Sequence, residues 1–458
     1  MLRIKTIRGG GAEAARYYSR ENERRPDEYY GREVDVRPVW WTPGETFGLR
    51  SGAEAAPDEI KRALAGRDPG GRGTTLTQPQ SRQDGSQRRA AYDLNMSLPK
   101  SVSVVYAAAD QPTRAALLAE IRSAAVEVLA EMQRHGDFTV RSGKGGKAQE
   151  GAADVLALVD VHQSNRDGAP FLHVHAVVMN FGRRSDGKTT VLNDREMHRA
   201  AGTAGALFRA GVAAALDRRG LGVERVPGKE GERAGSFRVA GVSPALEQAF
   251  AGRKERMVEY VVAKYGAVSG NAKVRASQLQ EAAQNTRGSK AAVPVGTALE
   301  AHWRATIVRQ GMTPEQVWDR ARRASRGIEQ PTLSAAEAVA LRVRQDDLKE
   351  PSAATLRLRV VVEAQYRGIG VAGAVAEMAR LERDGVQQVG REAERQRAGE
   401  KIGREGLAAV RLGAELVAGR DGLLATFTGT KDRGGGGGDS DTSAPRKRRR
   451  GQDQGQER

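Results

Sequence analysis

The stretch FLHVHAVVMNF at residues 171–181 decides the fold of this chain. It alternates with period two, yet both faces of the resulting strand are largely apolar, which is typical of a central strand covered on both sides. The run VLALVDVH at residues 155–162 is also rich in strand-forming residues, and an Asp167-Gly168 turn separates the two runs. They are therefore predicted to be neighbouring strands of a hairpin.

Histidine is concentrated in this hairpin, because three of the six histidines, His162, His173 and His175, fall within fourteen residues. His173 and His175 lie two apart on a strand and leave the same face, while His162 ends the preceding strand. Three converging imidazoles leave coordination positions open, as in a catalytic metal site. The chain has no cysteine, so thiolate ligands are excluded. The alternative is a set of unconnected histidines, as is usual for an isolated His-x-His.

Outward from the hairpin, residues 1–325 alternate strand-type runs with capped helices, which predicts an α+β fold with helices over a sheet. Further strands are predicted at residues 101–108, 189–192, 224–226 and 236–239. Helices are predicted at residues 112–136, 194–220 and 243–265, and after a capping box that starts at Thr313.

The composition changes near residue 330, where Ala, Arg, Glu and Leu predominate. Residues 326–427 are therefore predicted to form an all-helical accessory region. Five glycines at 434–438 and the run PRKRRR at 445–450 predict a disordered, basic tail over residues 428–458. The basic cluster has two interpretations, contact with nucleic acid and a plain solvated tail.

The charge balance points to a polyanionic partner. The 458 residues carry a formal net charge of +17, which favours nucleic acid above all. No apolar run approaches the roughly 18 residues of a membrane-spanning helix, and the first ten residues lack the apolar core of a signal peptide. The sequence therefore predicts no membrane insertion and residence in the cytoplasm.

Tyrosine forms a second pattern, since four of the nine tyrosines make two adjacent pairs, Tyr17-Tyr18 and Tyr29-Tyr30. A phenol is a poor nucleophile while protonated, with an ordinary pKa near 10, but a metal and a nearby carboxylate can activate it. Aromatic packing of an N-terminal helix is the alternative interpretation.

The segment YDLNMSLPKSVS at residues 92–103 is a third candidate. It places the carboxylate of Asp93 just ahead of the strand predicted at 101–108. Lys100 and the hydroxyls that follow it suit contact with phosphate. By spacing alone, the segment is not specific for any chemistry.

One motif competes with this interpretation. GRRSDGKT at residues 182–189 satisfies the P-loop pattern GxxxxGK[ST], which predicts ATP hydrolysis that Lys188→Ala would abolish. A P-loop opens directly into a helix, whereas residues 189–193 have the pattern of a strand after an Asp-Gly hairpin turn. Nucleotide binding is therefore the weaker interpretation.

These segments, in this order, resemble the conjugative relaxases of the MobF (TrwC/TraI) type, DNA-nicking enzymes of the HUH superfamily. The tyrosine pairs are followed by WTPG at 41–44 and FGL at 47–49, similar to the family's W-x-G…LGL stretch. The run that starts at Asp93 is similar to the family's D-x-T-F-S-x-P-K-S-V-S, with Asn95 and Met96 in place of Thr-Phe. The histidine motif and the DGK hairpin come next, and the resemblance covers residues 1–325.

The resemblance implies an HUH relaxase palm, a central antiparallel sheet flanked by helices, and strand-specific nicking at a transfer origin. Tyr17 would form a 5′-phosphotyrosine link, Tyr29 would make a second transfer, and Asp93 would orient a histidine or accept the tyrosine proton. The three histidines would hold a divalent ion, Mg²⁺ or Mn²⁺ from the family, although imidazole ligands intrinsically favour Zn²⁺, Ni²⁺ or Cu²⁺. The remaining candidates are Tyr18 and Tyr30 for catalysis and Arg16, Trp41 and Lys100 for DNA binding. DNA bases would stack on aromatic residues such as Trp40 and Trp41.

The partners implied are single-stranded DNA, the transfer-origin duplex, a type IV secretion coupling protein and a separate helicase, because no two-lobed motor pattern follows residue 325. A plasmid or integrative element would encode the protein, and passage with DNA into a recipient cell is implied by the family alone. Two alternatives stay open. A rolling-circle replication initiator would use the same chemistry at a replication origin, and a non-enzymatic basic DNA-binding protein would function unchanged without Tyr17 or the histidines.

Overall fold

The structure is a computed structural model that describes residues 2–8, 37–77, 89–144, 147–165, 167–226, 235–286, 296–345 and 351–426. Contacts within the chain group residues 1–395 into one unit and residues 396–458 into another. The elements described below belong to the first unit, apart from the end of the last helix. Within the described ranges, no helix is both long enough and apolar enough to cross a membrane.

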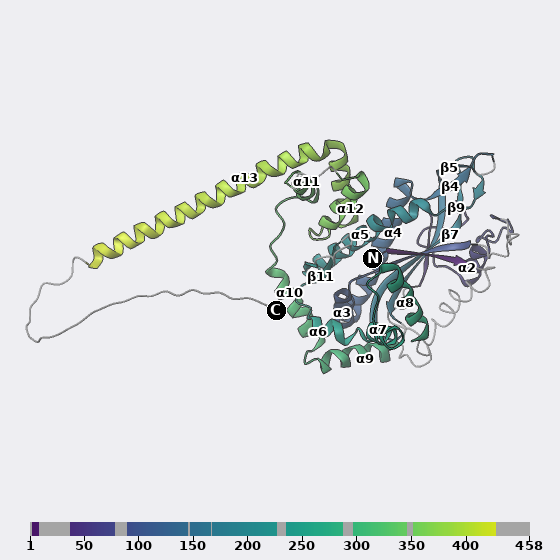
Figure 1. The fold of residues 1–458 in the computed structure, drawn as a ribbon, viewed down its shortest axis with the longest axis horizontal. Helices are drawn as coiled ribbons and strands as arrows, with labels where there is room; N and C mark the ends of the chain where they lie inside the picture. The colour runs from purple at the N-terminus through teal and green to yellow at the C-terminus, as the bar shows by residue number, and fades with distance from the viewer. Residues whose placement is uncertain are drawn as a thin grey trace, which may run out of the picture. The chain divides into compact units, whose positions relative to one another are not determined.

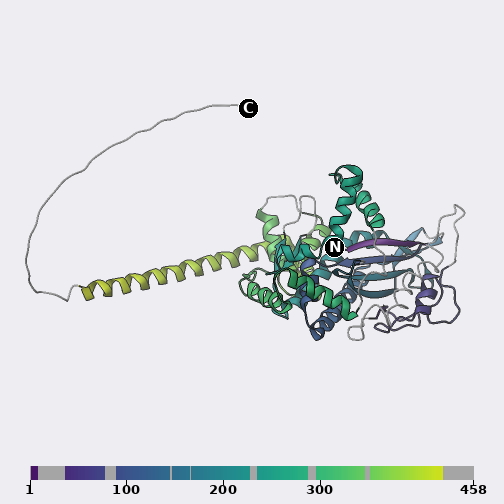
Figure 2. The same ribbon diagram turned by 90° about the horizontal axis from the view of Figure 1, so that it is seen from below.

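A six-stranded sheet runs through the first unit in the order β1-β3-β7-β6-β2, with β8 paired to β7. Every pairing is antiparallel, and Figure 2 shows the strands side by side. The bounds are β1 Leu2–Arg8, β2 Val39–Trp41, β3 Arg89–Ser97, β6 Asp154–Ser164, β7 Pro170–Arg183 and β8 Thr189–Thr190. The predicted hairpin is thus confirmed as β6 and β7 and lies inside the sheet.

The two faces of the sheet bury different sets of residues. Even-numbered residues of β7, such as Val174 and Ala176, pack in the larger core under α3 (Lys100–Ala108), α4 (Gln111–His135) and α5 (Arg195–Asp217). Odd-numbered residues such as Val177 and Met179 pack on the opposite face with Ile60 of α2 (Pro57–Leu64). Toward the start of β7 this second face carries histidines in place of apolar residues, as the period of two requires.

Residues 101–108, predicted to be a strand, are instead part of helix α3, so that prediction was wrong. All of them are buried. The hydroxyl of Ser101 accepts the backbone N–H of Val239, and that of Ser103 accepts the backbone N–H of Leu172, both at 3.0 Å. The β-branched residues of this segment are buried in the helix, and this burial outweighs their local preference for a strand.

Two predicted helix boundaries are confirmed by their caps. In α4 the side chain of Asp110 accepts the N–H of Thr113 at 2.8 Å, and Gly136 ends the helix with a φ of 78°. In α10 (Pro314–Arg326) the reciprocal capping box of Thr313 and Gln316 is formed. The helix predicted over residues 243–265 is two helices, α6 (Pro244–Ala249) and α7 (Gly252–Tyr265).

Further strands and helices complete the part of the chain that the structure describes (Figure 1). A three-stranded sheet has the order β5-β4-β9, and β10 pairs with β11. Their bounds are β4 Thr139–Ser142, β5 Ala148–Gly151, β9 Leu192–Asn193, β10 Val223–Val226 and β11 Ser236–Val239. The other helices are α8 Ala272–Asn285, α9 Gly296–Arg309, α11 Ala335–Gln345, α12 Ala353–Ala364 and α13 Gly370–Thr426.

In the region after residue 326 the described elements are the helices α11, α12 and α13, as predicted. As far as residue 395, they belong to the same unit as the sheet. Helix α12 contacts α5, and α11 contacts α12 (Figure 1). Helix α13 is interrupted at Gly385, whose φ of 76° and ψ of 152° are not helical. The predicted tail, residues 428–458, lies outside the described residues.

A buried carboxylate attaches α12 to its neighbours. Glu363 is 3% exposed, and its carboxylate accepts N–H groups of Arg225 from β10 at 2.9 Å and of Arg367 at 3.0 Å. Arg342 of α11 lies 3.0 Å away. Burial alone would raise the pKa of Glu363, but the hydrogen bonds and charges of these arginines, Arg225 above all, outweigh it and lower the pKa to about 2.

This arrangement predicts a pH-dependent loss of stability in Glu363→Gln. Because the pKa of the folded state is lowered, the carboxylate contributes fully above its ordinary value of 4.5 and loses that contribution as the pH falls toward about 2. At pH 7 the free energy of unfolding of the variant should be about 3 kcal/mol lower than that of the parent. Thermal unfolding of both proteins from pH 3 to pH 8 should show the difference shrinking below pH 4.5. The exposed Glu224→Gln is the control, and a pH-independent difference for Glu363→Gln would contradict the prediction.

Candidate metal centre

Strands β6 and β7 bring the three predicted histidines together. In the antiparallel register His162 lies opposite His173, and Asp160 lies opposite His175. The ring centroids are 4.7 to 5.0 Å apart. One nitrogen of each ring lies within 4.8 Å of those of the other two. The convergence follows from the period of two, which puts all three rings on the face that α2 leaves uncovered at this end of the strands.

Each imidazole is held by an oxygen through one of its nitrogens. Nδ1 of His175 lies 2.9 Å from both carboxylate oxygens of Asp93. Nδ1 of His173 lies 2.9 Å from the carbonyl oxygen of Phe171, and Nε2 of His162 lies 2.9 Å from Oδ2 of Asp160. Because these oxygens only accept hydrogen bonds, each contacted nitrogen carries the proton and the other nitrogen carries the lone pair.

The side-chain amide of Asn95 lies beside the lone pair of His175. Its Nδ2 lies 3.3 Å from Nε2 of His175, opposite which Asn95 pairs in the β3–β7 register. An amide N–H at this position donates to the same lone pair that a metal would take. A cation on His175 would therefore replace a weak hydrogen bond from a neutral amide.

The electrostatics favour neutral ligands. His173 is 8% exposed, and burial, followed by the proximity of His162 and His175, lowers the pKa of His173 well below its ordinary value of 6.5. This imidazole is therefore neutral at physiological pH and can act as a ligand without losing a proton. Three imidazole nitrogens, on rings two of which are backed by carboxylates, fit a divalent cation that keeps coordination positions open.

Asp93 lies in the site, although not at the position expected from the sequence. It was predicted just ahead of a strand, but it lies within β3, because residues 89–97 form the strand and residues 100–108 form a helix. The carboxylate is 7% exposed. Both of its oxygens face the imidazole of His175, so the geometry favours orientation of that histidine.

Lys100 begins α3 beside the start of β7. Its Nζ donates to the carbonyl oxygen of Pro170 at 2.9 Å and lies 6.0 Å from the centre of the Phe171 ring. Burial lowers the pKa of Lys100 to about 8. The ammonium form still predominates at pH 7, and it lies near the strand that carries His173.

Trp41, predicted to stack on DNA bases, is buried in the structure. It is 4% exposed and packs against Phe138, with ring centroids 6.2 Å apart. Its neighbour Trp40 is fully buried, and Nε1 of that residue donates to Glu59 at 2.8 Å. Neither ring has a face available for a base, so the stacking prediction for these two residues was wrong. Their neighbour Thr42 is also structural, since its hydroxyl donates to the buried Asp154 at 2.8 Å.

The tyrosine pairs Tyr17-Tyr18 and Tyr29-Tyr30, and Arg16 with them, lie outside the described residues. The flanking described segments are β1, which ends at Arg8, and the segment that resumes at Arg37. Strand β1 pairs with β3, and β2 pairs with β6. The chain thus enters and leaves this segment through the sheet that carries the histidines.

Two groups of residues at the site were not predicted from the sequence. Asp160 and Asn95 touch the imidazoles, and the available signal was their even spacing from His162 and from Asp93, which puts each on the histidine face. Arg3 and Lys5 of β1 are exposed and pair with Asn95 and Asp93, respectively. They place positive charge on the same face, where it suits a nucleic-acid backbone.

The P-loop interpretation is excluded by the strands around it. Gly182 pairs with Thr190 and Arg183 with Thr189, so residues 182–190 form a hairpin. The next helix, α5, begins only at Arg195. No helix N-terminus follows the glycine-lysine pair directly, and a phosphate-binding P-loop requires one.

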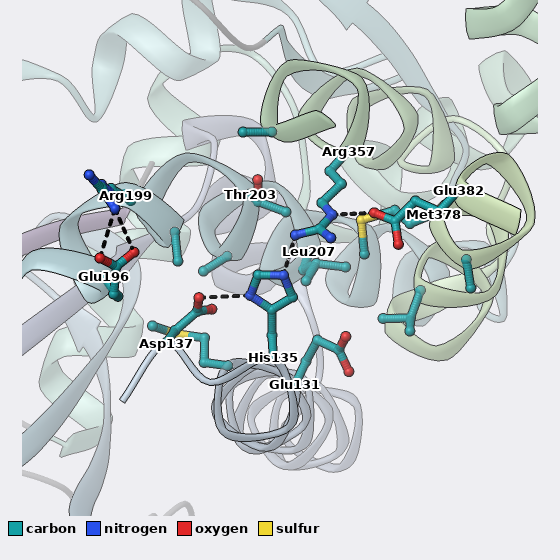
Figure 3. Close-up of a pocket in the computed structure, with 16 residues that line it drawn as sticks. Glu131, His135, Asp137, Glu196, Arg199, Thr203, Leu207, Arg357, Met378 and Glu382 are labelled. Atoms are coloured by element: carbon teal, nitrogen blue, oxygen red, sulfur yellow. Dashed lines mark hydrogen bonds and ion pairs between the residues drawn. The ribbon is translucent and has the colours of Figure 1, made fainter. Parts of the chain in front are cut away.

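A separate cavity of about 280 Å³ lies between α4, α5, α12 and α13 (Figure 3). None of the predicted site residues lines it. Its charged side chains pair with one another, as Glu196 does with Arg199 at 2.8 Å and Asp137 with His135 at 2.8 Å, while Arg357 contacts Glu382. The polar groups named here are therefore satisfied within the protein.

The chain is similar to a known protein family and to several solved structures. The sequence profile of the TrwC relaxase family matches residues 11–310. Among curated proteins no match was found. Similar solved structures include conjugative relaxase TrwC in complex with oriT DNA in a metal-bound form, with 29% identity and a TM-score of 0.53, and in a copper-bound form, with 28% identity and a TM-score of 0.54.

A third similar structure is TrwC complexed with a 27-mer DNA that comprises the recognition hairpin and the cleavage site, with 27% identity and a TM-score of 0.51. Each of the three matches covers 69% of this chain and 100% of the solved one. The profile spans more than half of the chain and includes β3, β6 and β7 with all three histidines. On this extent of agreement, the chain belongs to the TrwC relaxase family.

Proposed function

We propose that this protein is a conjugative relaxase that nicks one DNA strand at a transfer origin and rejoins it after transfer. The observation that carries the proposal is the convergence of His162, His173 and His175 in a chain of this family. The similar TrwC structures contain oriT DNA, which supports the same class of substrate here. The excess of 17 positive charges suits a nucleic-acid partner.

The proposed reaction is a transesterification by Tyr17. Its phenolic oxygen attacks the scissile phosphorus, a bond from phosphorus to the tyrosine oxygen forms, and the bond to the 3′ oxygen breaks. The tyrosine gives up its proton, the departing 3′ oxygen takes one up, and the products are a 5′-phosphotyrosine and a free 3′-hydroxyl. The phosphodiester count is unchanged, so a 3′-hydroxyl can later reverse the step and religate the DNA.

The residues of the metal centre have different roles in this reaction. His162, His173 and His175 would hold a divalent cation, and Asp93 keeps the lone pair of His175 directed toward it through the contact with Nδ1. When bound, such a cation polarises the phosphate and stabilises the charge that develops on its oxygens. Mg²⁺ or Mn²⁺ is proposed from the family, whereas imidazole chemistry and the copper-bound relative favour the later transition metals such as Ni²⁺ and Zn²⁺.

The remaining site residues, of which the structure describes Lys100, keep their proposed roles. Tyr29 is the candidate for the second transfer, while Tyr18 and Tyr30 are the alternative nucleophiles of each pair. Arg16 and Lys100 are proposed to contact DNA phosphates. Lys100 is supported by its place beside the start of β7, where its amine donates to Pro170.

The nicking activity is proposed to reside in residues 1–325, with residues 326–427 as an accessory region and 428–458 as a tail. Helix α12 of the accessory region contacts α5, and Glu363 joins it to Arg225. A protein cut at residue 325 would lose these contacts, so the full chain is the form to assay.

The partners are proposed from the family resemblance. They are the transfer-origin duplex and its single-stranded form, a type IV secretion coupling protein, and a separate helicase to unwind the DNA. The nicking step is assigned to the cytoplasm of the donor cell, with passage of the linked protein into the recipient.

A denaturing gel of the full chain tests the reaction class. The protein is incubated with a diverse single-stranded DNA library, with and without Mn²⁺ or Mg²⁺, and covalent adducts are isolated and sequenced. A metal-dependent adduct enriched in one sequence supports the proposal, and the location of that sequence distinguishes a transfer origin from a replication origin. If no adduct forms even with DNA from the element that encodes the protein, a non-enzymatic DNA-binding protein is the better account.

A further inference from the structure

A second carboxylate contacts the histidine cluster, and the proposed reaction does not use it. Oδ2 of Asp160 lies 2.9 Å from Nε2 of His162, and Asp160 is 3% exposed. We propose that Asp160 is a positioning residue for metal binding, which orients His162 and adds negative charge beside the cation. The inference rests on the proposed function, which places a divalent cation between the three histidines.

The contact determines which nitrogen of His162 is available. A carboxylate can only accept a hydrogen bond, so Nε2 of His162 carries the proton and Nδ1 carries the lone pair. In His173 and His175 the arrangement is reversed, because their Nδ1 atoms face oxygens and their Nε2 atoms carry the lone pairs. The structure therefore assigns Nδ1 of His162 and Nε2 of the other two rings as the ligand atoms.

Asp160 acts through His162 and not as a ligand. Among the residues that the structure describes, the group of atoms able to hold an ion within 4.8 Å of one another consists of the three histidine nitrogens. Asp160 lies opposite His175 in the register of β6 and β7, and it lies two residues before His162 on the same strand. Its side chain thus lies on the histidine face of the sheet, where it contacts Nε2 of His162.

The two carboxylates make the centre asymmetric. Asp93 supports His175 and Asp160 supports His162, while the described partner of the His173 ring nitrogen is a backbone carbonyl. A buried carboxylate is costly unless it is paired or hydrogen bonded. The cation would neutralise part of this buried negative charge, so removal of the charge from Asp160 should weaken cation binding without removing a ligand.

The test is a Mn²⁺ titration of the metal-stripped full chain by calorimetry. In Asp160→Asn the dissociation constant should rise by about 10–100-fold, the range found when a carboxylate behind a metal-bound histidine is removed. Asp137→Asn is the matched control, because Asp137 lies 2.8 Å from Nδ1 of His135 in another carboxylate-histidine pair, outside the metal cluster (Figure 3). It should bind Mn²⁺ as the parent does. Asp160→Glu restores the charge and should recover most of the lost affinity.

If Asp160 had a merely structural role, Asp160→Asn would lower the melting temperature measured in EDTA and leave the Mn²⁺ affinity of the folded protein unchanged. The positioning role instead reduces the rise in melting temperature that Mn²⁺ produces. The visible spectrum of the Co²⁺-substituted protein should also change in Asp160→Asn, because the ligand field of His162 changes. If Asp160→Asn does not fold, Asp160→Ser replaces it.

His173→Ala separates failure of the inference from failure of the proposed function. If that variant binds Mn²⁺ as tightly as the parent, the histidines are not the metal site, and the proposed function loses its main support. If His173→Ala loses Mn²⁺ while Asp160→Asn binds it with the parental affinity, the metal site stands and the role of Asp160 is overturned.

Discussion

His173→Ala is expected to lose metal-dependent cleavage of single-stranded transfer-origin DNA by about 10²–10³-fold or more, the range reported for loss of one group that stabilises transition-state charge. The imidazole is 8% exposed and neutral, and it lies opposite His162 in the hairpin. Its removal leaves two ligands and an opening in the centre of the cluster. Nonspecific DNA affinity should remain close to that of the parent, because it depends on basic side chains elsewhere on the surface.

The measurement combines a cleavage gel with fluorescence anisotropy on the same oligonucleotide. His198→Ala is the matched control, since His198 is an exposed histidine of α5 away from the cluster. It should cleave and bind normally. Equal cleavage by His173→Ala and the parent would remove the metal site from the mechanism, whereas equal loss of binding and cleavage would indicate a damaged fold.

Tyr17→Phe is expected to abolish the covalent adduct while leaving metal and DNA binding intact. The substitution removes only the phenolic oxygen, the atom proposed to form the bond to phosphorus. Without this oxygen, residue 17 cannot form the covalent link to DNA. The readout is a denaturing gel with an end-labelled oligonucleotide, followed by mass spectrometry of the peptide that carries the nucleotide.

Tyr18→Phe is the paired control for the nucleophile. Two adjacent residues on a helix point about 100° apart, so only one member of the pair is expected to face the scissile phosphate. Tyr18→Phe should therefore retain the adduct. Persistence of the adduct in Tyr17→Phe would move the nucleophile to Tyr18 or to the pair Tyr29-Tyr30, and the peptide map would identify which.

The residues of the histidine centre were predictable because their signals are local. The period of two in the run at 171–181 and the Asp167-Gly168 turn determine that β6 and β7 pair and that His162, His173 and His175 share a face. The caps of α4 and α10 were also readable, since an Asp or Thr side chain meets backbone N–H groups within one turn of its own helix.

The errors have a common cause, which is burial by elements distant in the sequence. Residues 101–108 look like a strand until α3 is enclosed between the sheet and other helices, and their hydroxyls accept N–H groups of Leu172 and Val239. Trp41 looks available for stacking until Phe138 covers it. The distant elements that bury these residues cannot be recognised from a local sequence pattern.

By itself, then, the sequence determined the family resemblance, the hairpin and the three imidazoles, because hydrophobic period, turn residues and motif order are properties of short segments. Only the tertiary structure decided that Asp93 lies within β3 against His175, that Asp160 contacts His162, and that α12 packs on α5. Those contacts join residues that are far apart in the chain or depend on the rotation of a ring. The long-range contacts and the ring orientations are determined by packing of the whole sheet and its helices, which no short segment encodes.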